Sequence, residues 1–186
     1  MYSEQGERNP PAEGSSDQTR GKRAEQARGY RAAVLTISDK CSTGQREDRS
    51  GKIVQELIRG LPAEVVKYDV IPDEPDMIKE RLIDYCDNLK VDLVLTNGGT
   101  GFTVRDFTPE ATREVIEKEA PGIPEAMRVT CLKSTKRAML SRAIAGIRNK
   151  TLIVNLPGSS QGAKESLEAI LETLPHGLDM ILGKEH

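Results

Sequence analysis

Aromatic residues are scarce in this chain of 186 residues, since they make up 3% of the sequence and tryptophan is absent. This scarcity argues against a surface that binds single-stranded nucleic acid by base stacking. Basic residues are not in excess either, because 27 Lys and Arg stand against 29 Asp and Glu, a net charge of −2. Nucleic acid is therefore not an expected partner, and an anionic ligand must be held by local groups.

Long apolar runs are also lacking. No stretch approaches the roughly 20 apolar residues of a membrane span, and the first residues have no apolar signal-peptide core. We therefore expect a cytoplasmic protein with no membrane partner. The cysteines, Cys41, Cys86 and Cys131, are far apart and form no CxxC pair, which argues against a disulfide framework or a zinc site. His176 and His186 are the only histidines, which argues against nucleophilic triads and histidine metal centres.

Residues 1–29 contain almost no aliphatic side chains and are rich in Gly, Pro, Ser, Glu, Gln and Arg. Such a segment cannot bury enough apolar surface to offset the entropy of ordering, so we predict a disordered N-terminal tail. The remaining residues, 30–186, have the length and composition of a single domain with its own core.

Short apolar runs alternate with amphipathic stretches along this domain. The predicted strands are residues 32–37, 64–71, 91–96, 143–147 and 151–155, the last two forming a hairpin or a closely returning pair. The predicted helices are residues 49–59, 75–88, 109–119, 123–132 and 161–174. Strands separated by helices of this length indicate an α/β fold with a mainly parallel sheet covered on both faces.

The most informative segment, residues 97–112, reads NGGTGFTVRDFTPEAT and follows the apolar run at residues 91–96. A glycine loop between a strand and a helix start can bind an anion, because free amides and the positive end of the helix dipole face one point. The glycine spacing fits neither a dinucleotide fingerprint nor a Walker A loop, so a generic glycine turn is the alternative interpretation.

Two charged residues in this loop strengthen the case for phosphate chemistry. Arg105 can neutralise phosphate charge with directed donors, and Asp106 beside a phosphate is most simply explained by a divalent cation. The alternative is that Asp106 or Thr108 caps the following helix. Thr108 suffices for that role, which leaves Asp106 free.

A second carboxylate, Asp73, follows the strand predicted at residues 64–71. Ligands in open α/β sheets gather outside the carboxyl ends of the strands, so Asp73 and Asp106 could face one crevice. Two hard oxygen ligands suit Mg²⁺ held jointly with a substrate phosphate. Capping of the next helix by Asp73 or Glu74 is an equally good interpretation of this stretch alone.

Two further strand ends carry small polar groups. Gly158 and Ser159 precede a predicted helix and could seat a phosphate at its N-terminus, although Ser159 could instead only cap that helix. Ser38 and Asp39 follow the first predicted strand. Four such loops at one sheet edge favour chemistry by positioning and charge stabilisation, as in phosphoryl and nucleotidyl transfer.

Five motifs taken together resemble the molybdenum cofactor biosynthesis family of molybdopterin-binding proteins, over about residues 31–183. They are the TISD segment at 36–39 with Ser42 and Gly44, Asp48 with Ser50 and Gly51, the IPDE segment at 71–74, the long motif at 97–112, and NLPGS at 155–159. The chain has Ser160 where the family commonly has a proline, which affects only the shape of that turn.

The resemblance implies a three-layer αβα fold, usually assembled as a homotrimer. It implies transfer of AMP from ATP, with Mg²⁺, to the terminal phosphate of molybdopterin, with release of pyrophosphate and a molybdenum-insertion protein as a further partner. A non-adenylylating molybdopterin-binding or scaffold member of the same fold is the alternative.

The resemblance also assigns roles to residues. Asp73 and Asp106 match the essential acidic positions of the family, so they are the expected catalytic and Mg²⁺-binding residues. The residues expected to contact molybdopterin or ATP are Ser38, Asp39, Gly98, Gly99, Thr100, Gly101, Arg105, Thr108, Gly158 and Ser159.

Overall fold

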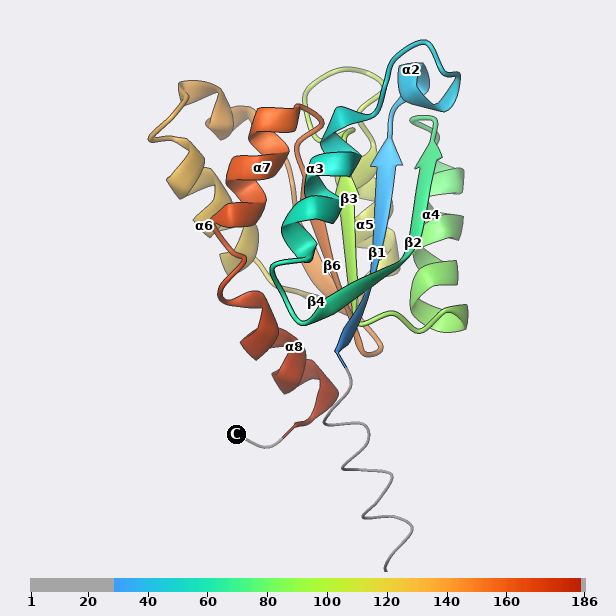
Figure 1. Cartoon of the computed structure of the whole chain (residues 1–186). Helices are drawn as coiled ribbons and strands as arrows, with labels where there is room; N and C mark the ends of the chain where they lie inside the picture. Colours follow the sequence, from blue (N-terminus) through green and yellow to red (C-terminus); the bar gives the residue numbers. More distant parts are fainter. Residues whose placement is uncertain (1–28, 185–186) are drawn as a thin grey trace, which may run out of the picture.

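A six-stranded sheet runs through the centre of the structure, a computed structural model that describes residues 29–184 (Figure 1). The sheet order is β2-β1-β3-β6-β5-β4. The strands are β1 (Tyr30–Ile37), β2 (Ala63–Ile71), β3 (Leu93–Asn97), β4 (Lys118–Glu119), β5 (Ala145–Arg148) and β6 (Thr151–Leu156). Strands β2, β1, β3 and β6 pair in parallel with one another, whereas β5 pairs antiparallel with both β6 and β4. The predicted α/β fold with a mainly parallel sheet is confirmed.

Helices cover both faces of the sheet and complete three layers (Figure 1). One face packs against α3 (Arg49–Ile58), α6 (Gly122–Cys131), α7 (Ser160–Glu168) and α8 (Leu174–Leu182). The other packs against α4 (Pro75–Ile83), the π-helix η1 (Asp84–Asn88) and α5 (Thr108–Val115). Neighbouring residues of a strand contribute to opposite cores, as Val34 and Leu35 do, so the central strands are apolar on both faces. Between residues 29 and 184, no helix has the length and apolar character needed to cross a membrane.

The predicted element boundaries need three corrections. The helix predicted at 109–119 ends at Val115, because Lys118–Glu119 forms the edge strand β4. Gly146 of β5 permits this pairing, since an added Cβ there would lie 2.7 Å from the Lys118 carbonyl oxygen. The helix predicted at 75–88 changes to a π-helix after Ile83.

The helix predicted at 161–174 ends at Glu168, and a new helix begins at Leu174 with Pro175 in its first turn. Two short elements were not predicted: α2 (Asp39–Ser42) and the 3₁₀-helix η2 (Lys136–Leu140). The hairpin is confirmed, with Asn149 at a φ of 51° in its turn. The predicted tail, residues 1–29, lies outside the described residues except for Gly29.

A buried amide ties three elements together near the carboxyl ends of the strands. Asn155 of β6 is fully buried, and its Nδ2 donates to Thr96 Oγ1 of β3 and Thr112 Oγ1 of α5, both at 3.0 Å. Its Oδ1 accepts from the backbone amide of Ile144 at 3.4 Å. Because a buried polar group needs a partner, these bonds fix the position of α5 against β3 and β6.

We predict that Asn155→Ala lowers the free energy of unfolding by about 2–4 kcal/mol, since it leaves a small cavity and unpaired buried hydroxyls. Denaturant unfolding followed by circular dichroism measures this difference. Asn88→Ala is the matched control, because Asn88 is exposed and its side chain bonds only the nearby Asp84 among the described residues, at 2.9 Å. It should cost less than about 0.5 kcal/mol. Equal effects of the two substitutions would contradict the role of Asn155.

Candidate functional site

The carboxyl ends of four parallel strands meet at one edge of the sheet, near α2 in Figure 1. The loops that follow these strands carry the residues singled out in the sequence: Ser38 and Asp39 after β1, Asp73 after β2, the glycine loop after β3, and Gly158 and Ser159 after β6. The parallel topology therefore brings the predicted site residues to one edge.

The glycine loop lies tightly against its neighbours. Gly98 has a φ of 109°, and an added Cβ would collide with the Ile37 carbonyl oxygen at the end of β1. Gly99 has a φ of 62°, and its added Cβ would collide with Thr108 Oγ1 and lie 3.1 Å from Asp73 Oδ1. Only glycine suits both the positive φ and the close approach, so both glycines are required by the packing of this loop against its neighbours.

Asp39 and Asp73 hold the ends of β1 and β2 together by reciprocal hydrogen bonds. The Asp39 amide donates to Asp73 Oδ2 at 3.0 Å, and the Asp73 amide donates to Asp39 Oδ1 at 3.1 Å. Burial raises the pKa of Asp73, and the negative charges of Asp39 and Asp106 add to that rise. The hydrogen bonds from Arg105 and from the Asp73 amide lower the pKa of Asp39. Both carboxylates lie against the glycine loop, because an added Cβ would be 3.1 Å from Asp73 Oδ1 at Gly99 and 3.0 Å from Asp106 Oδ2 at Gly101.

Arg105 connects three of the loops. Its Nε and Nη2 donate to the Asp39 carboxylate at 3.2 and 2.9 Å, and Nη2 also donates to Glu74 Oε1 at 2.8 Å. All three side chains are about half exposed. The arginine expected to contact phosphate is therefore held at the cleft by carboxylates of the neighbouring loops, and Glu74 joins the site without having been predicted.

Asp106 closes a turn of its own loop. Its Oδ2 accepts from the Thr103 amide at 2.7 Å, and its amide donates to the Thr103 carbonyl at 3.1 Å. The idea that Asp106 or Thr108 caps α5 is wrong, because Phe107 occupies the cap position and no side chain caps this helix start. Thr108 is instead the first helical residue, with a buried hydroxyl that has no hydrogen-bond partner in the described part of the chain.

The capping alternative for the loop after β2 is also wrong. Glu74 is at the cap position of α4 but makes no side-chain capping bond, and Asp73 bonds to Asp39 instead. For Ser159 the capping interpretation is confirmed, because its Oγ accepts from the Gly162 amide at 3.1 Å. Ser38 similarly caps the short helix α2 through the Cys41 amide at 3.3 Å.

Two carboxylates of this edge fit a hard cation. Within residues 29–184, no hydrogen bond reaches Asp73 Oδ1 or Asp106 Oδ1, so each carboxylate keeps one oxygen available. In the same residues, no group of three or more His, Cys, Asp or Glu side chains is arranged to hold a metal. A cation here would need further oxygen ligands from substrate and water, which is how Mg²⁺ is usually held beside phosphates.

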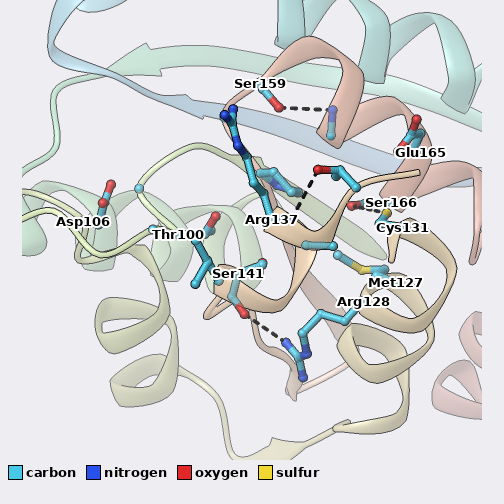
Figure 2. Close-up of a pocket in the computed structure, with 18 residues that line it drawn as sticks. Thr100, Asp106, Met127, Arg128, Cys131, Arg137, Ser141, Ser159, Glu165 and Ser166 are labelled. Carbon is cyan, nitrogen blue, oxygen red and sulfur yellow. Dashed lines mark hydrogen bonds between the residues drawn. The ribbon is translucent and has the colours of Figure 1, made fainter. Parts of the chain in front are cut away.

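A cavity of about 400 Å³ opens between the glycine loop, α6 with η2, and the start of α7 (Figure 2). Asp106 lies at one side of this cavity, while Met127, Cys131 and Glu165 lie at the other (Figure 2). A second hollow, of about 310 Å³, lies between the start of α3 and the start of α7. Both are lined by Gly158 and Ser159, so the two hollows adjoin each other at this turn.

A polar network beneath the edge fixes the start of α3, which lines the smaller hollow. The Asp48 carboxylate accepts from Tyr68 Oη at 2.6 Å, from the Gly51 amide at 2.9 Å and from the Thr36 hydroxyl. Burial alone would raise the pKa of Asp48, but the hydrogen bonds from Thr36, Tyr68 and Gly51 together lower it. Asp48 therefore stays ionised and acts as a structural anchor.

Several residues at the site were not predicted. Glu165 and Arg137 line the larger cavity, Arg46 lines the smaller one, and Arg142 binds the glycine loop. Glu165 lies on α7, and Arg137 and Arg142 lie in the irregular segment after α6, where no strand end or glycine motif marks them. Arg46 lies between the motif residues Gly44 and Asp48 but was not itself singled out. The basic residues Lys133, Lys136, Arg137 and Arg142 are the signal that could have drawn attention to the segment after α6, but composition alone does not assign it to a ligand.

Comparison with known proteins identifies the family. The family described as a probable molybdopterin binding domain matches residues 33–176. The chain is 47% identical to the molybdopterin adenylyltransferase of Helicobacter pylori strain J99 over 152 residues, which cover 81% of this chain and 86% of that protein. It is 38% identical to gephyrin of Dictyostelium discoideum over 185 residues, 94% of this chain and 25% of gephyrin.

Solved structures agree with this relationship. The molybdopterin biosynthesis enzyme MoaB from Thermus thermophilus superimposes with a TM-score of 0.80 at 51% identity, covering 83% of this chain and 98% of MoaB. The tungsten cofactor synthesizing protein MoaB from Pyrococcus furiosus has a TM-score of 0.73 at 34% identity, covering 82% and 97%. The chain therefore belongs to the molybdopterin-binding family of molybdenum cofactor biosynthesis proteins.

Proposed function

We propose that this chain is a nucleotidyltransferase that adenylylates molybdopterin. A terminal phosphate oxygen of molybdopterin attacks the α-phosphorus of ATP, the bond from that phosphorus to the bridging oxygen breaks, and pyrophosphate leaves. The products are adenylylated molybdopterin and pyrophosphate. The observation that carries the proposal is that Asp106, the glycine loop and the start of α7 line one hollow, which adjoins a second hollow at Gly158 and Ser159. Asp73 lies beside this site, because its Oδ1 would be 3.1 Å from a Cβ added at Gly99.

Two hollows suit a reaction between two phosphate-bearing substrates. Gly158 and Ser159 line both of them, at the start of α7, where the first amides of the helix lack intrahelical acceptors. Ser159 occupies one of these amides as the cap, and the remaining ones can donate to phosphate oxygens. The reacting phosphates would therefore meet at this turn, between the two ligands.

Charge stabilisation is the main task of the residues around this turn. Asp73 and Asp106 would hold Mg²⁺, which supplies neutralisation of the phosphate charge during transfer. Arg105 would exchange its carboxylate partners for phosphate oxygens, because a guanidinium makes directed bonds to either group. Gly99, Thr100 and Gly101 line the larger cavity and let a ligand approach the backbone closely.

The experiment that tests the proposal is incubation of the purified chain with molybdopterin, ATP and Mg²⁺, with detection of adenylylated product and pyrophosphate. Both should form in equal amounts, and chelation of Mg²⁺ should stop their formation. Binding of molybdopterin without any product would support the alternative, a binding or scaffold member of the fold.

The proposal includes a homotrimer, the cytoplasm as its location, and a molybdenum-insertion protein as the partner that receives the product. The trimer is tested by light scattering coupled to size-exclusion chromatography. Three chains of 20.4 kDa give an expected mass of about 61 kDa. A mass equal to one, two or six chains would contradict the trimer.

We predict that Asp73→Asn and Asp106→Asn each lower turnover on the order of a hundredfold or more. Each substitution keeps the size of the side chain but removes the charge that a hard cation requires. Steady-state pyrophosphate release measures turnover, and unfolding curves check that both variants stay folded. Near-normal turnover in both variants would disprove the metal assignment.

We predict that Ser159→Asp weakens binding of both ATP and molybdopterin by at least about tenfold, because it adds negative charge beside both hollows. Aspartate is as good an N-cap as serine, so the stability of α7 should be preserved. Isothermal titration of each ligand measures the effect.

Thr173→Asp is the matched control, because Thr173 is the exposed N-cap of α8 and lines neither hollow. This control should bind both ligands with wild-type affinity. Unchanged affinities in a folded Ser159→Asp protein would place the phosphates elsewhere.

A further inference from the structure

The loop that carries Arg105 and Asp106 projects from the body of the protein. Between Gly101 and Thr108 it exposes Phe102 and Val104, at 69% and 87% of their surface, so apolar burial contributes little to holding it. Catalysis by positioning nevertheless requires the Asp106 carboxylate to be held within a fraction of an ångström. Some other interaction must fix this loop.

Arg142 makes that interaction. Its Nε donates to the Gly101 carbonyl at 2.6 Å, and its Nη2 donates to the Asp106 carbonyl at 2.6 Å. These carbonyls stand at the two ends of the projecting segment, so one guanidinium sets the distance between them. The Arg142 amide adds a bond to the Thr100 carbonyl at 2.9 Å.

The guanidinium is itself fixed from a third side. Its Nη1 donates to Glu110 Oε1 on α5, whose first residues follow the loop. All three nitrogens of the guanidinium are therefore used, in three directions of one plane. A lysine at this position has a single point of charge and cannot reach both carbonyls and the carboxylate together.

Arg142 also links the loop to the wall of the larger cavity. It directly follows Ser141, and Leu140 and Ser141 line that cavity together with Gly101 and Asp106 (Figure 2). Arg105 holds the opposite flank of the loop through Asp39 and Glu74. However, these bonds are exposed, and a phosphate would compete with them for Arg105. Arg142 lines neither hollow, and its side chain bonds to two backbone carbonyls and to Glu110.

We propose that Arg142 is a positioning residue for the adenylyl transfer. It keeps the loop closed so that Asp106 stays at the metal-binding edge while Arg105 exchanges carboxylates for phosphate. This inference rests on the proposed function for its kinetic consequence, but its structural consequence, the closure of the loop, can be measured without turnover.

The structural test is limited digestion with trypsin, which cleaves after Arg105 when the loop is released. Arg142→Lys should raise the rate of this cleavage about tenfold relative to wild type, as followed by mass spectrometry.

Arg148→Lys is the matched control. Arg148 binds a carbonyl and a carboxylate in the same manner, Val115 O at 3.0 Å and Asp87 at 2.6 and 3.0 Å, but it lies on β5 away from the loop. Its variant should be cleaved after Arg105 at the wild-type rate.

The kinetic test uses the same variants. Arg142→Lys should lower kcat about tenfold or more and raise the Mg²⁺ concentration for half-maximal rate several-fold, while KM for molybdopterin changes less than about twofold. Arg148→Lys should leave all three quantities within about twofold of wild type. In the Asp106→Asn background, Arg142→Lys should cost little more, because the group that it positions is already inactive.

The outcomes separate the two proposals. If Arg142→Lys is cleaved faster after Arg105 but the wild type shows no turnover, Arg142 holds the loop as proposed and the proposed activity is disproved. If the wild type turns over but Arg142→Lys shows normal cleavage and normal kcat, or if its effects add fully to those of Asp106→Asn, the positioning role is overturned.

Glu110→Gln is the second variant, for the case that Arg142→Lys does not fold. It keeps an acceptor for Arg142 but removes the charge of Glu110, and it should change cleavage and kcat in the same direction by about two- to fivefold. A Glu110→Gln protein with wild-type cleavage and kcat would then refute the proposal.

Discussion

Close contact between loop backbones at Gly98 is the constraint on which the site depends. The Gly98 amide donates to the Leu156 carbonyl at the end of β6 at 3.1 Å, and a side chain at Gly98 would collide with Ile37 at the end of β1. An added Cβ at Gly158 would lie 3.1 Å from the Gly98 Cα. Three loops therefore meet with no side chain between them. A larger residue at position 158 would push this turn away from the glycine loop and change the shape of both hollows that it lines.

The loops that meet at this edge carry more negative than positive side chains. Asp39, Asp73, Glu74 and Asp106 lie at the edge where the proposed reaction would bring two anionic substrates together, and Arg105 bonds to Asp39 and Glu74. Four carboxylates would repel phosphates unless some of their charge were neutralised. Within the protein itself, burial and the neighbouring negative charges raise the pKa of Asp73, whereas the hydrogen bond from Arg105 lowers the pKa of Asp39. A divalent cation between Asp73 and Asp106 would relieve the repulsion and attract phosphate, so an acidic edge is compatible with a phosphate-binding site.

Much of this arrangement could be predicted from the sequence, since the strand ends are marked by apolar runs followed by glycine or aspartate. Asp73, Asp106 and the Gly158 turn were placed at one edge by the rule for parallel sheets alone. Helix capping was predicted less well. Threonine is a common N-cap residue, but Thr108 is the first helical residue of α5. Its backbone amide donates to the Gly99 carbonyl at 3.1 Å, which holds it against the glycine loop. Composition cannot reveal which backbone group a folded loop presents. Arg142 was missed for the same reason, since its bonds to the loop are made to backbone carbonyls, which every sequence contains.

The chemistry of the nucleophile explains why the site contains carboxylates and amides without a histidine base. A phosphate monoester has a second pKa near 6, so at neutral pH the attacking oxygen is already mostly ionised. No side chain has to remove a proton in this step. His176 lies on α8, which is near the start of β1, at the end of the sheet opposite to the site (Figure 1). What limits the reaction is repulsion between two anions and the accuracy with which they are aligned. In the proposed reaction, a cation held by Asp73 and Asp106 would reduce the repulsion, and the bonds of Arg105 and Arg142 to the two flanks of the loop would maintain the alignment. The two arginines and the two aspartates would then act as one functional unit.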